Sequence, residues 1–385
     1  MDSYIEEIRS ICDPIITNFD TSMKVLIEYV MLILSLSRDR AFCKKNVYDG
    51  IVKQLICTLY KDVFVGEYDS FTIHDNSHIV DYLKTIPQFE QRTPEWFKMK
   101  EDSIGASESA IVFGKSIFSN RKKLLLKKSG HKEKWVQNAA CQHGTKYEPI
   151  VQLLYQIKNN TTLYEFGSIV HSKYPMISAS PDGITETGVM VEIKVPYKRI
   201  IKGIPPVYYW YQMQQQMEVC NLDRVDFVEC KISEYFNKQI FTADQNTDSN
   251  GVIDPNDYHN HDGNIKNVII EFFKKDATGR MTTDWIYPDK FLKLDEIVEW
   301  VAKHRGILDS DPGRVFSRDI YYKIDIYSCY PVWRDKLWWK DNYHEFLNFW
   351  KEVEHYRIIG NESLLNKRVS KKRAPKYLIM DDDDD

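Results

Sequence analysis

Three charged residues in the middle of the chain have the types and the spacing that could hold a metal ion. Asp182 follows Pro181 in a turn-forming Pro-Asp-Gly sequence, and Glu192 and Lys194 lie in a short run of mostly β-branched residues. Side chains alternate along a strand, so Glu192 and Lys194 share one face. If Asp182 folds back beside that strand, two carboxylates and one ammonium converge. Carboxylate oxygens are the ligands that Mg²⁺ prefers.

The elements that must position these groups are two turns and one strand. Gly183 and Gly188 mark the turns, and residues 189–195 predict an apolar strand that Pro196 ends. Charged side chains on an apolar strand are costly to bury, which favours a functional site. The same spacing also fits a hairpin with an exposed, salt-bridged face, so the motif alone leaves both interpretations open.

Two predicted helices precede the hairpin and carry candidate groups for binding an anion. Thr93 followed by Pro94 predicts a helix start, and Lys100 belongs to that helix. Ser107 and Glu108 open a second helix, where free backbone amides and a hydroxyl suit a phosphate. Simple capping of the helix would explain the same residues equally well.

Two more predicted helices flank the hairpin. A helical pattern that starts at Pro149 places Glu148 at its first turn, where the helix dipole alone could explain an acid. Residues 207–220 predict another helix, in which Tyr209, Gln212 and Gln216 fall close to one face. Further strands are predicted at 167–171, 225–230 and 268–273, and a further helix at 295–304.

Composition indicates an ordered globular protein of 385 residues, 43% of them hydrophobic. The formal charge is −4, but five acids form the terminal run Asp381 to Asp385, without which the charge would be slightly positive. Basic stretches at 121–134 and 367–373 could contact a polyanion or be solvated surface. No apolar run is long enough to predict a membrane-spanning helix. Seven cysteines without paired spacing indicate an intracellular, reducing compartment.

Taken together, these pieces resemble the lambda-exonuclease-like family, also called YqaJ-like viral recombinases, of the PD-(D/E)xK nuclease superfamily. The resemblance spans residues 91–232, somewhat over a third of the chain. It is carried by Trp96, Ser107-Glu108, Gly144-x-x-x-Glu148, Ser180-Pro-Asp-Gly183, Glu192-x-Lys194 and Tyr209-x-x-Gln212-x-Gln214. Larger versions with added terminal regions resemble nucleases of nucleocytoplasmic large DNA viruses, so we expect a viral origin.

The resemblance implies an α/β fold with a restriction-endonuclease-like core, in which helices flank a central mixed sheet. We expect four regions along the chain: an N-terminal helical accessory region at 1–88, a nuclease core at 89–310, an aromatic-rich C-terminal extension at 311–370 and a charged tail at 371–385. The aromatic residues of the extension, Trp333, Trp338, Trp339 and Trp350, are expected to be core rather than a platform for bases.

The resemblance also assigns roles to single residues. Asp182, Glu192 and the Ile193 backbone carbonyl would be metal ligands, and Lys194 would orient and help deprotonate the attacking water. Glu148 would be an additional acid near the metal, and Gln212 would line the site. The pocket for a 5′-phosphate would contain Lys100, Ser107 and Ser180. The phage member of the family has arginine at the position of Lys100, and a lysine offers a point charge instead of a bidentate fork.

The implied function is a Mg²⁺-dependent deoxyribonuclease, with Mn²⁺ as a substitute metal, that digests double-stranded DNA ends 5′→3′ in viral recombination, repair or replication. An endonuclease of the same fold and a DNA-binding or assembly protein without turnover are the alternatives. The resemblance further implies a homo-oligomer in the form of a trimeric ring and a single-strand annealing protein as partner. Because the sequence has no long apolar run, we expect no membrane association. We expect the protein in the host cytoplasm, a viral factory, the virion or the nucleus.

Overall fold

The computed structural model describes residues 9–10, 12–13, 75–88, 93–131, 138–247, 257–276 and 279–366. Most of the expected N-terminal helical region therefore lies outside the described residues. The charged tail and the basic stretch at 367–373 lie outside them as well. Within the described part, no helix is long and apolar enough to cross a membrane.

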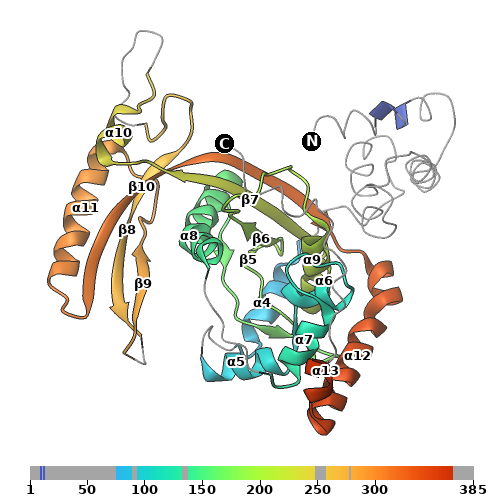
Figure 1. The fold of residues 1–385 in the computed structure, drawn as a ribbon. Helices are drawn as coiled ribbons and strands as arrows, with labels where there is room; N and C mark the ends of the chain where they lie inside the picture. The colour runs from blue at the N-terminus through green and yellow to red at the C-terminus, as the bar shows by residue number, and fades with distance from the viewer. Residues whose placement is uncertain are drawn as a thin grey trace.

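A seven-stranded mixed sheet forms the centre of the molecule and confirms the predicted fold class (Figure 1). Strands β6 and β7 are parallel, and every other neighbouring pair is antiparallel. In spatial order the strands are β2 (Leu163–Tyr164), β5 (Gly183–Thr185), β6 (Met190–Lys194), β7 (Arg224–Glu234), β10 (Arg314–Trp333), β8 (Lys266–Lys275) and β9 (Met281–Ile286).

A second, three-stranded sheet lies beside the first. Its middle strand, β4 (Ile177–Ala179), pairs in parallel with β1 (Ile104–Gly105) and antiparallel with β3 (Ile169–Val170). Because β4 leads directly into the Pro181–Gly183 turn, this small sheet ties the segment after β1 to the start of the hairpin. It therefore brings the two regions with predicted functions close together.

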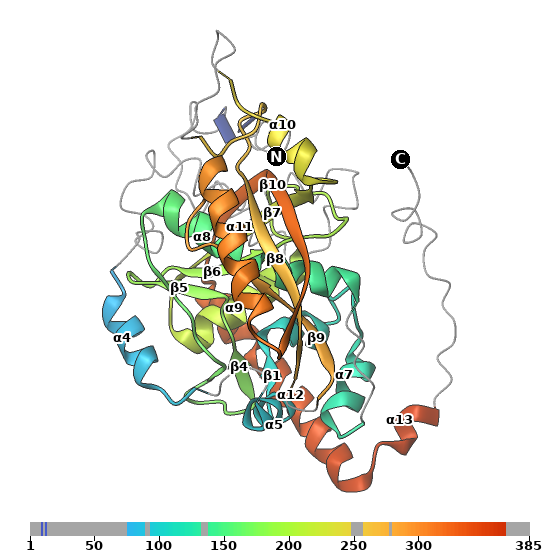
Figure 2. The same cartoon turned by 90° about the vertical axis from the view of Figure 1, so that its left-hand side faces the viewer.

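Helices cover both faces of the central sheet (Figure 2). On one face, Met190 packs with side chains of α4, α6, α7, α9 and α12, whereas on the other Val191 and Ile193 pack with α8. Successive residues of β6 therefore point to opposite faces of the sheet, as its sequence predicts. The helices are α4 (Ser77–Thr85), α5 (Pro94–Glu101), η2 (Ala106–Glu108), α6 (Ser109–Val112), α7 (Arg121–Lys128), α8 (Ala139–Asn159), α9 (Val207–Cys220), α10 (Lys238–Ala243), α11 (Leu294–Asp309), α12 (Lys336–Ile359) and α13 (Glu362–Asn366).

An arm projects from this body and contains β8, β9, α10, α11 and the first part of β10 (Figure 1). The 20-residue strand β10 joins the two parts, because it pairs with β8 in the arm and with β7 in the body. The segment after residue 310, expected as an extension, thus supplies a strand to the middle of the central sheet. Its tryptophans Trp333, Trp338, Trp339 and Trp350 are buried in the core, as predicted.

The start of α8 differs from the prediction. The helix begins at Ala139 after an Asn138 cap, whose Oδ1 accepts from the Cys141 backbone N–H at 2.8 Å. Pro149 consequently lies inside the helix instead of opening it. Glu148 is therefore a mid-helix residue, and the favourable dipole at a helix start does not account for it.

Candidate active site

The β5–β6 hairpin brings Asp182 beside the strand that carries the other two charged residues. Gly183 pairs with Val191, and the Ile193 backbone N–H donates to Asp182 Oδ2 at 2.8 Å. The turn between the strands needs Gly188, which has a φ of +86°. A Cβ at that position would lie 2.6 Å from the Asn76 Cβ, so any other residue would disturb the hairpin.

Lys194 is the centre of the candidate site. Its Nζ donates to Glu192 Oε1 and to the Ile193 carbonyl at 3.0 Å, and lies 3.9 Å from Asp182 Oδ2. These three oxygens belong to the residues that the family resemblance implies as metal ligands. One cation thus contacts all of them in this structure, and the hairpin interpretation with an exposed, salt-bridged face is wrong because Glu192 is fully buried.

Two glutamines of α9 complete the surroundings of Glu192. Gln212 Nε2 donates to Glu192 Oε1 at 2.6 Å, and Gln216 Nε2 donates to Oε2 at 2.6 Å. The two glutamines are four residues apart, so they lie one helical turn from each other on the same face. The sequence pattern placed both on that face but assigned a role only to Gln212.

The electrostatics of the site favour a further positive charge. Burial raises the pKa of Asp182 well above its usual range, and the charges of Glu192 and Glu148 add to the effect against the opposing charge of Lys194. Burial alone would lower the pKa of Lys194, but Glu192 and Asp182 outweigh it and raise that pKa. Lys194 therefore stays an ammonium, and the Asp182 carboxylate is costly to ionise without another cation.

The residues present fit a hard divalent cation with a partly hydrated shell. Among the residues that the structure describes, no group of three or more His, Cys, Asp and Glu side chains could hold a metal by itself. The candidate ligands are instead two carboxylates and the carbonyl of Ile193. Mg²⁺ commonly binds in this way, through one or two carboxylates with several waters retained.

Glu148 and its helix form one wall of the site. Glu148 is half-buried and close enough to Asp182 for its charge to raise the Asp182 pKa. One turn further along α8, Gln152 Nε2 donates to the Asp182 backbone carbonyl at 2.9 Å. The helix therefore holds the Pro181–Gly183 turn in place and adds an acid beside it, as the predicted role of Glu148 requires.

The residues of the predicted phosphate pocket lie on neighbouring segments. Strand β1 runs parallel to β4, so the turn with Ser107 and the turn with Ser180 leave the small sheet at the same end. Ser107 is exposed in η2, and Ser180 Oγ is buried without a hydrogen-bond partner among the described residues. Lys100 Nζ lies next to Gly105, 3.7 Å from where a Cβ of that residue would be.

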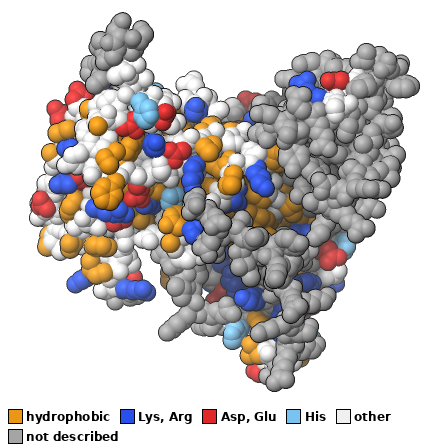
Figure 3. Space-filling view, turned by 45° about the horizontal axis from the view of Figure 1, so that its top comes forward, with side chains coloured by type: hydrophobic (Ala, Val, Ile, Leu, Met, Phe, Trp, Pro, Cys, Tyr) orange, Lys and Arg blue, Asp and Glu red, His pale blue; other side chains and the backbone are white. Residues whose placement is uncertain are grey.

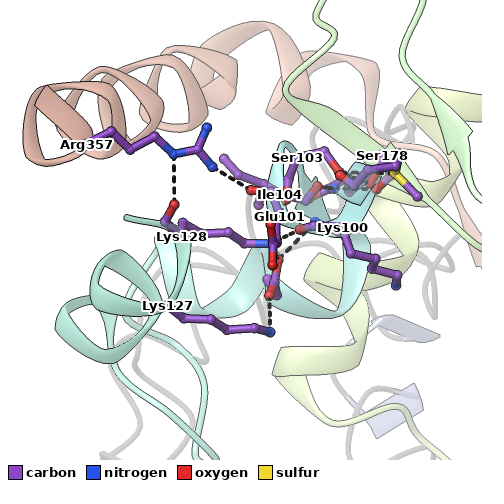
Figure 4. A network of polar contacts seen from close by, with 12 residues as sticks. Lys100, Glu101, Ser103, Ile104, Lys127, Lys128, Ser178 and Arg357 are labelled. Carbon is purple, nitrogen blue, oxygen red and sulfur yellow. Dashed lines mark hydrogen bonds and ion pairs between the residues drawn. The ribbon is translucent and has the colours of Figure 1, made fainter. Parts of the chain in front are cut away.

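A buried charge network, which the sequence does not predict, contacts the backbone of Lys100 (Figure 4). The Lys128 side chain is buried, and its Nζ donates to the carbonyls of Lys100 and Ser103, both at 2.6 Å. Glu108 Oε2 pairs with Lys128 at 2.6 Å, and Glu108 Oε1 accepts from Lys127 at 2.9 Å. Lys128 belongs to the basic stretch at 121–134, where sequence gives no signal that distinguishes a buried lysine from an exposed one.

The long helix α12 contacts this network through Arg357. Arg357 Nε donates to the Lys128 carbonyl at 2.9 Å, and its Nη2 donates to the Glu101 carbonyl at 2.8 Å.

The charge of Lys100 depends on its neighbours. Burial lowers the pKa of Lys100, the charge of Glu108 opposes that shift and the charge of Lys127 reinforces it. The three lysines around Glu108, Lys100, Lys127 and Lys128, outnumber its carboxylate, which suits an anion.

Comparison with known proteins identifies relatives among DNA viruses. An uncharacterized protein of Acanthamoeba polyphaga mimivirus is 29% identical over 336 residues, which cover 77% of this chain and 60% of that protein. A protein of African swine fever virus is 28% identical over 166 residues, which cover 35% of this chain and 47% of that protein. The chain therefore spans only about half to 60% of the length of these relatives.

Solved structures of two exonucleases match more distantly. The alkaline exonuclease from Laribacter hongkongensis has a TM-score of 0.41 and 20% identity, over 71% of this chain and 98% of that chain. A phage-related exonuclease from Haemophilus somnus has a TM-score of 0.35 and 12% identity, over 68% of this chain and 96% of that chain.

The family described as YqaJ-like viral recombinase domain matches residues 95–223. This range contains Lys100, Glu148, the whole hairpin and both glutamines of α9. Residues 95–223 of this chain are therefore similar to the YqaJ-like viral recombinase domain, which agrees with the family resemblance of the sequence motifs.

Proposed function

We propose that this chain is a Mg²⁺-dependent deoxyribonuclease that digests double-stranded DNA ends in the 5′→3′ direction. The observation that carries the proposal is the position of Lys194 Nζ among oxygens of Asp182, Glu192 and Ile193, all on one buried hairpin. Such a set of oxygens around one positive charge is suited to a divalent cation. Mn²⁺ would serve as a substitute metal, because it favours the same kind of ligand.

Phosphodiester hydrolysis requires neutralised phosphate charge, an activated water and a stabilised leaving oxygen, which bound divalent cations can supply. The protein groups then have separate tasks. Asp182, Glu192 and the Ile193 carbonyl would hold the metal, and Glu148 would orient water on the α8 side. Lys194 remains an ammonium, so its task is to orient the attacking water or a phosphate oxygen by donating hydrogen bonds rather than to accept a proton.

Recognition of a DNA end would use the basic residues beside the hairpin. Lys100, Ser107 and Ser180 would bind the 5′-phosphate, which fixes the distance from the chain end to the metal. Lys127 is largely exposed and adds positive charge next to this pocket. Lys and Arg side chains lie among hydrophobic ones in the middle of the face shown in Figure 3, where they could contact a DNA backbone. A role in viral recombination, repair or replication agrees with the family and with the viral relatives.

The test is digestion of 5′-phosphorylated linear, nicked and circular duplex, with Mg²⁺ or with EDTA. The proposal predicts mononucleotide release from linear DNA only, starting at the 5′ end and dependent on Mg²⁺. Asp182→Asn should bind the same linear DNA without digesting it. Cleavage of circular DNA would instead establish an endonuclease, and binding without any turnover would establish a non-catalytic DNA-binding protein.

A further inference from the structure

We propose that Gln216 is a positioning residue that holds Glu192 Oε2 and thereby turns Glu192 Oε1 toward the metal site. The inference deepens the proposed function and rests on its assignment of Glu192 as a metal ligand. Gln216 belongs to α9, is almost completely buried and is not one of the residues that the family motifs of this chain single out.

The two carboxylate oxygens of Glu192 have different surroundings. Oε1 accepts from Lys194, whose Nζ also reaches the Ile193 carbonyl and lies 3.9 Å from Asp182 Oδ2, so Oε1 faces the other candidate ligands. Oε2 accepts from Gln216 at 2.6 Å. A cation held by Asp182 and Ile193 would therefore meet Oε1, while Oε2 stays bound to the amide of Gln216.

Burial makes this contact important. Glu192 and Gln216 are 0% and 1% exposed, so water cannot replace the amide easily if it is removed. A buried acceptor that loses its donor costs about 1–3 kcal/mol, and more when the acceptor is charged. The amide satisfies Oε2 without adding a positive charge, so the full negative charge of Glu192 remains available to a metal. Groups that orient metal ligands in this way commonly change metal affinity about 10- to 100-fold when mutated.

Helix α9 is fixed firmly enough for Gln216 to act as an anchor. Gln215 Nε2 donates to the carbonyls of Ile104 at 2.8 Å and Ser178 at 2.9 Å, and so ties the helix to the small sheet. Gln214 donates to the Trp333 carbonyl at 2.8 Å and ties it to the central sheet. Gln212, by contrast, is half-buried and donates to Oε1, the oxygen that a cation would share.

Gln215 provides a matched control for the experiment. It is as buried as Gln216, has the same side chain and lies next to it, but its amide contacts backbone carbonyls and not Glu192. Mn²⁺ binding to the full chain without DNA should be measured by calorimetry for wild type, Gln216→Met, Gln216→Asn and Gln215→Met. Methionine has similar length but no donor, and asparagine keeps a donor that is one methylene short.

The expected result is a Mn²⁺ Kd raised about 10- to 100-fold in Gln216→Met and by less in Gln216→Asn. The rise should be smallest in Gln215→Met, which removes one tie between α9 and the small sheet but keeps the Gln216 amide on Glu192. If digestion is then measured, excess metal should restore most of kcat in Gln216→Met. An unchanged Kd in both Gln216 variants, or equal rises in Gln216→Met and Gln215→Met, would overturn the inference. A wild type that binds Mn²⁺ but never digests DNA would contradict the proposed function alone, because the Kd comparison does not depend on turnover.

Discussion

Replacing Lys194 with methionine removes the ammonium that contacts the buried Glu192 carboxylate and the partly buried Asp182 carboxylate, and keeps a side chain of similar length. Lys194 Nζ lies 3.9 Å from Asp182 Oδ2, and at an effective dielectric constant of about 20 such a pair attracts by about 4 kcal/mol. Desolvation of the ammonium offsets part of this energy, and Glu192 contributes a second attraction. Removing one partner of a buried pair typically destabilises by about 3–5 kcal/mol, which is the loss we expect without metal near pH 8.

The loss should depend on pH in a defined direction. Without the ammonium, whose charge lowers it, the pKa of Asp182 rises further above its unfolded value, so the folded state binds more protons than the unfolded state. The free energy of unfolding of Lys194→Met then falls as pH rises. Its deficit relative to wild type should therefore be smaller near pH 6 than near pH 8. Urea unfolding in EDTA at both pH values measures this deficit.

Lys127→Met is the control for this experiment. Lys127 also pairs with a carboxylate, Glu108, but its side chain is 68% exposed, so its removal should cost less than about 1 kcal/mol. A loss below about 1 kcal/mol in Lys194→Met, or a deficit independent of pH, would refute the reasoning that Lys194 compensates the buried carboxylates.

Three other predictions concern Asp182, the phosphate pocket and the oligomeric state that the family resemblance implies. Asp182→Asn should raise the melting temperature in EDTA near pH 8, because burial and the charge of Glu192 raise the folded pKa of Asp182. The gain should vanish near pH 3, below the unfolded pKa of 3.8, and no gain near pH 8 would contradict this. Lys100→Ala should slow digestion of 5′-phosphorylated ends about 10- to 100-fold and affect 5′-hydroxyl ends much less, whereas equal effects would remove Lys100 from the phosphate pocket. Light scattering should detect a trimer, and a 45.5 kDa monomer with and without DNA would contradict the ring.

The elements that carry the site could be predicted because their sequence signals are local. The alternation in Val191, Glu192 and Ile193 identifies β6, and the Thr93 cap followed by Pro94 identifies α5, where Thr93 Oγ1 accepts from the Trp96 N–H at 3.3 Å. Each signal involves neighbouring residues and one periodicity.

What the sequence did not predict depends on contacts between distant segments. Lys128 is buried because the carbonyls of Lys100 and Ser103, 28 and 25 residues away, meet its ammonium. The start of α8 was misplaced because Pro149 resembles a first-turn proline, whereas the cap that begins the helix is Asn138. Gln216 lies on the predicted face of α9, but only the folded hairpin shows that its amide meets Glu192 across 24 residues.

The central claim is that the carboxylates of the β5–β6 hairpin form a metal-dependent hydrolytic site. The most direct measurement is the rate of nucleotide release from 5′-phosphorylated linear duplex with Mg²⁺, for wild type and for Glu192→Gln, which keeps the size of the side chain and removes its charge. The account predicts digestion by wild type and a loss of orders of magnitude in the variant, with DNA binding retained. Digestion by Glu192→Gln at the wild-type rate would contradict it.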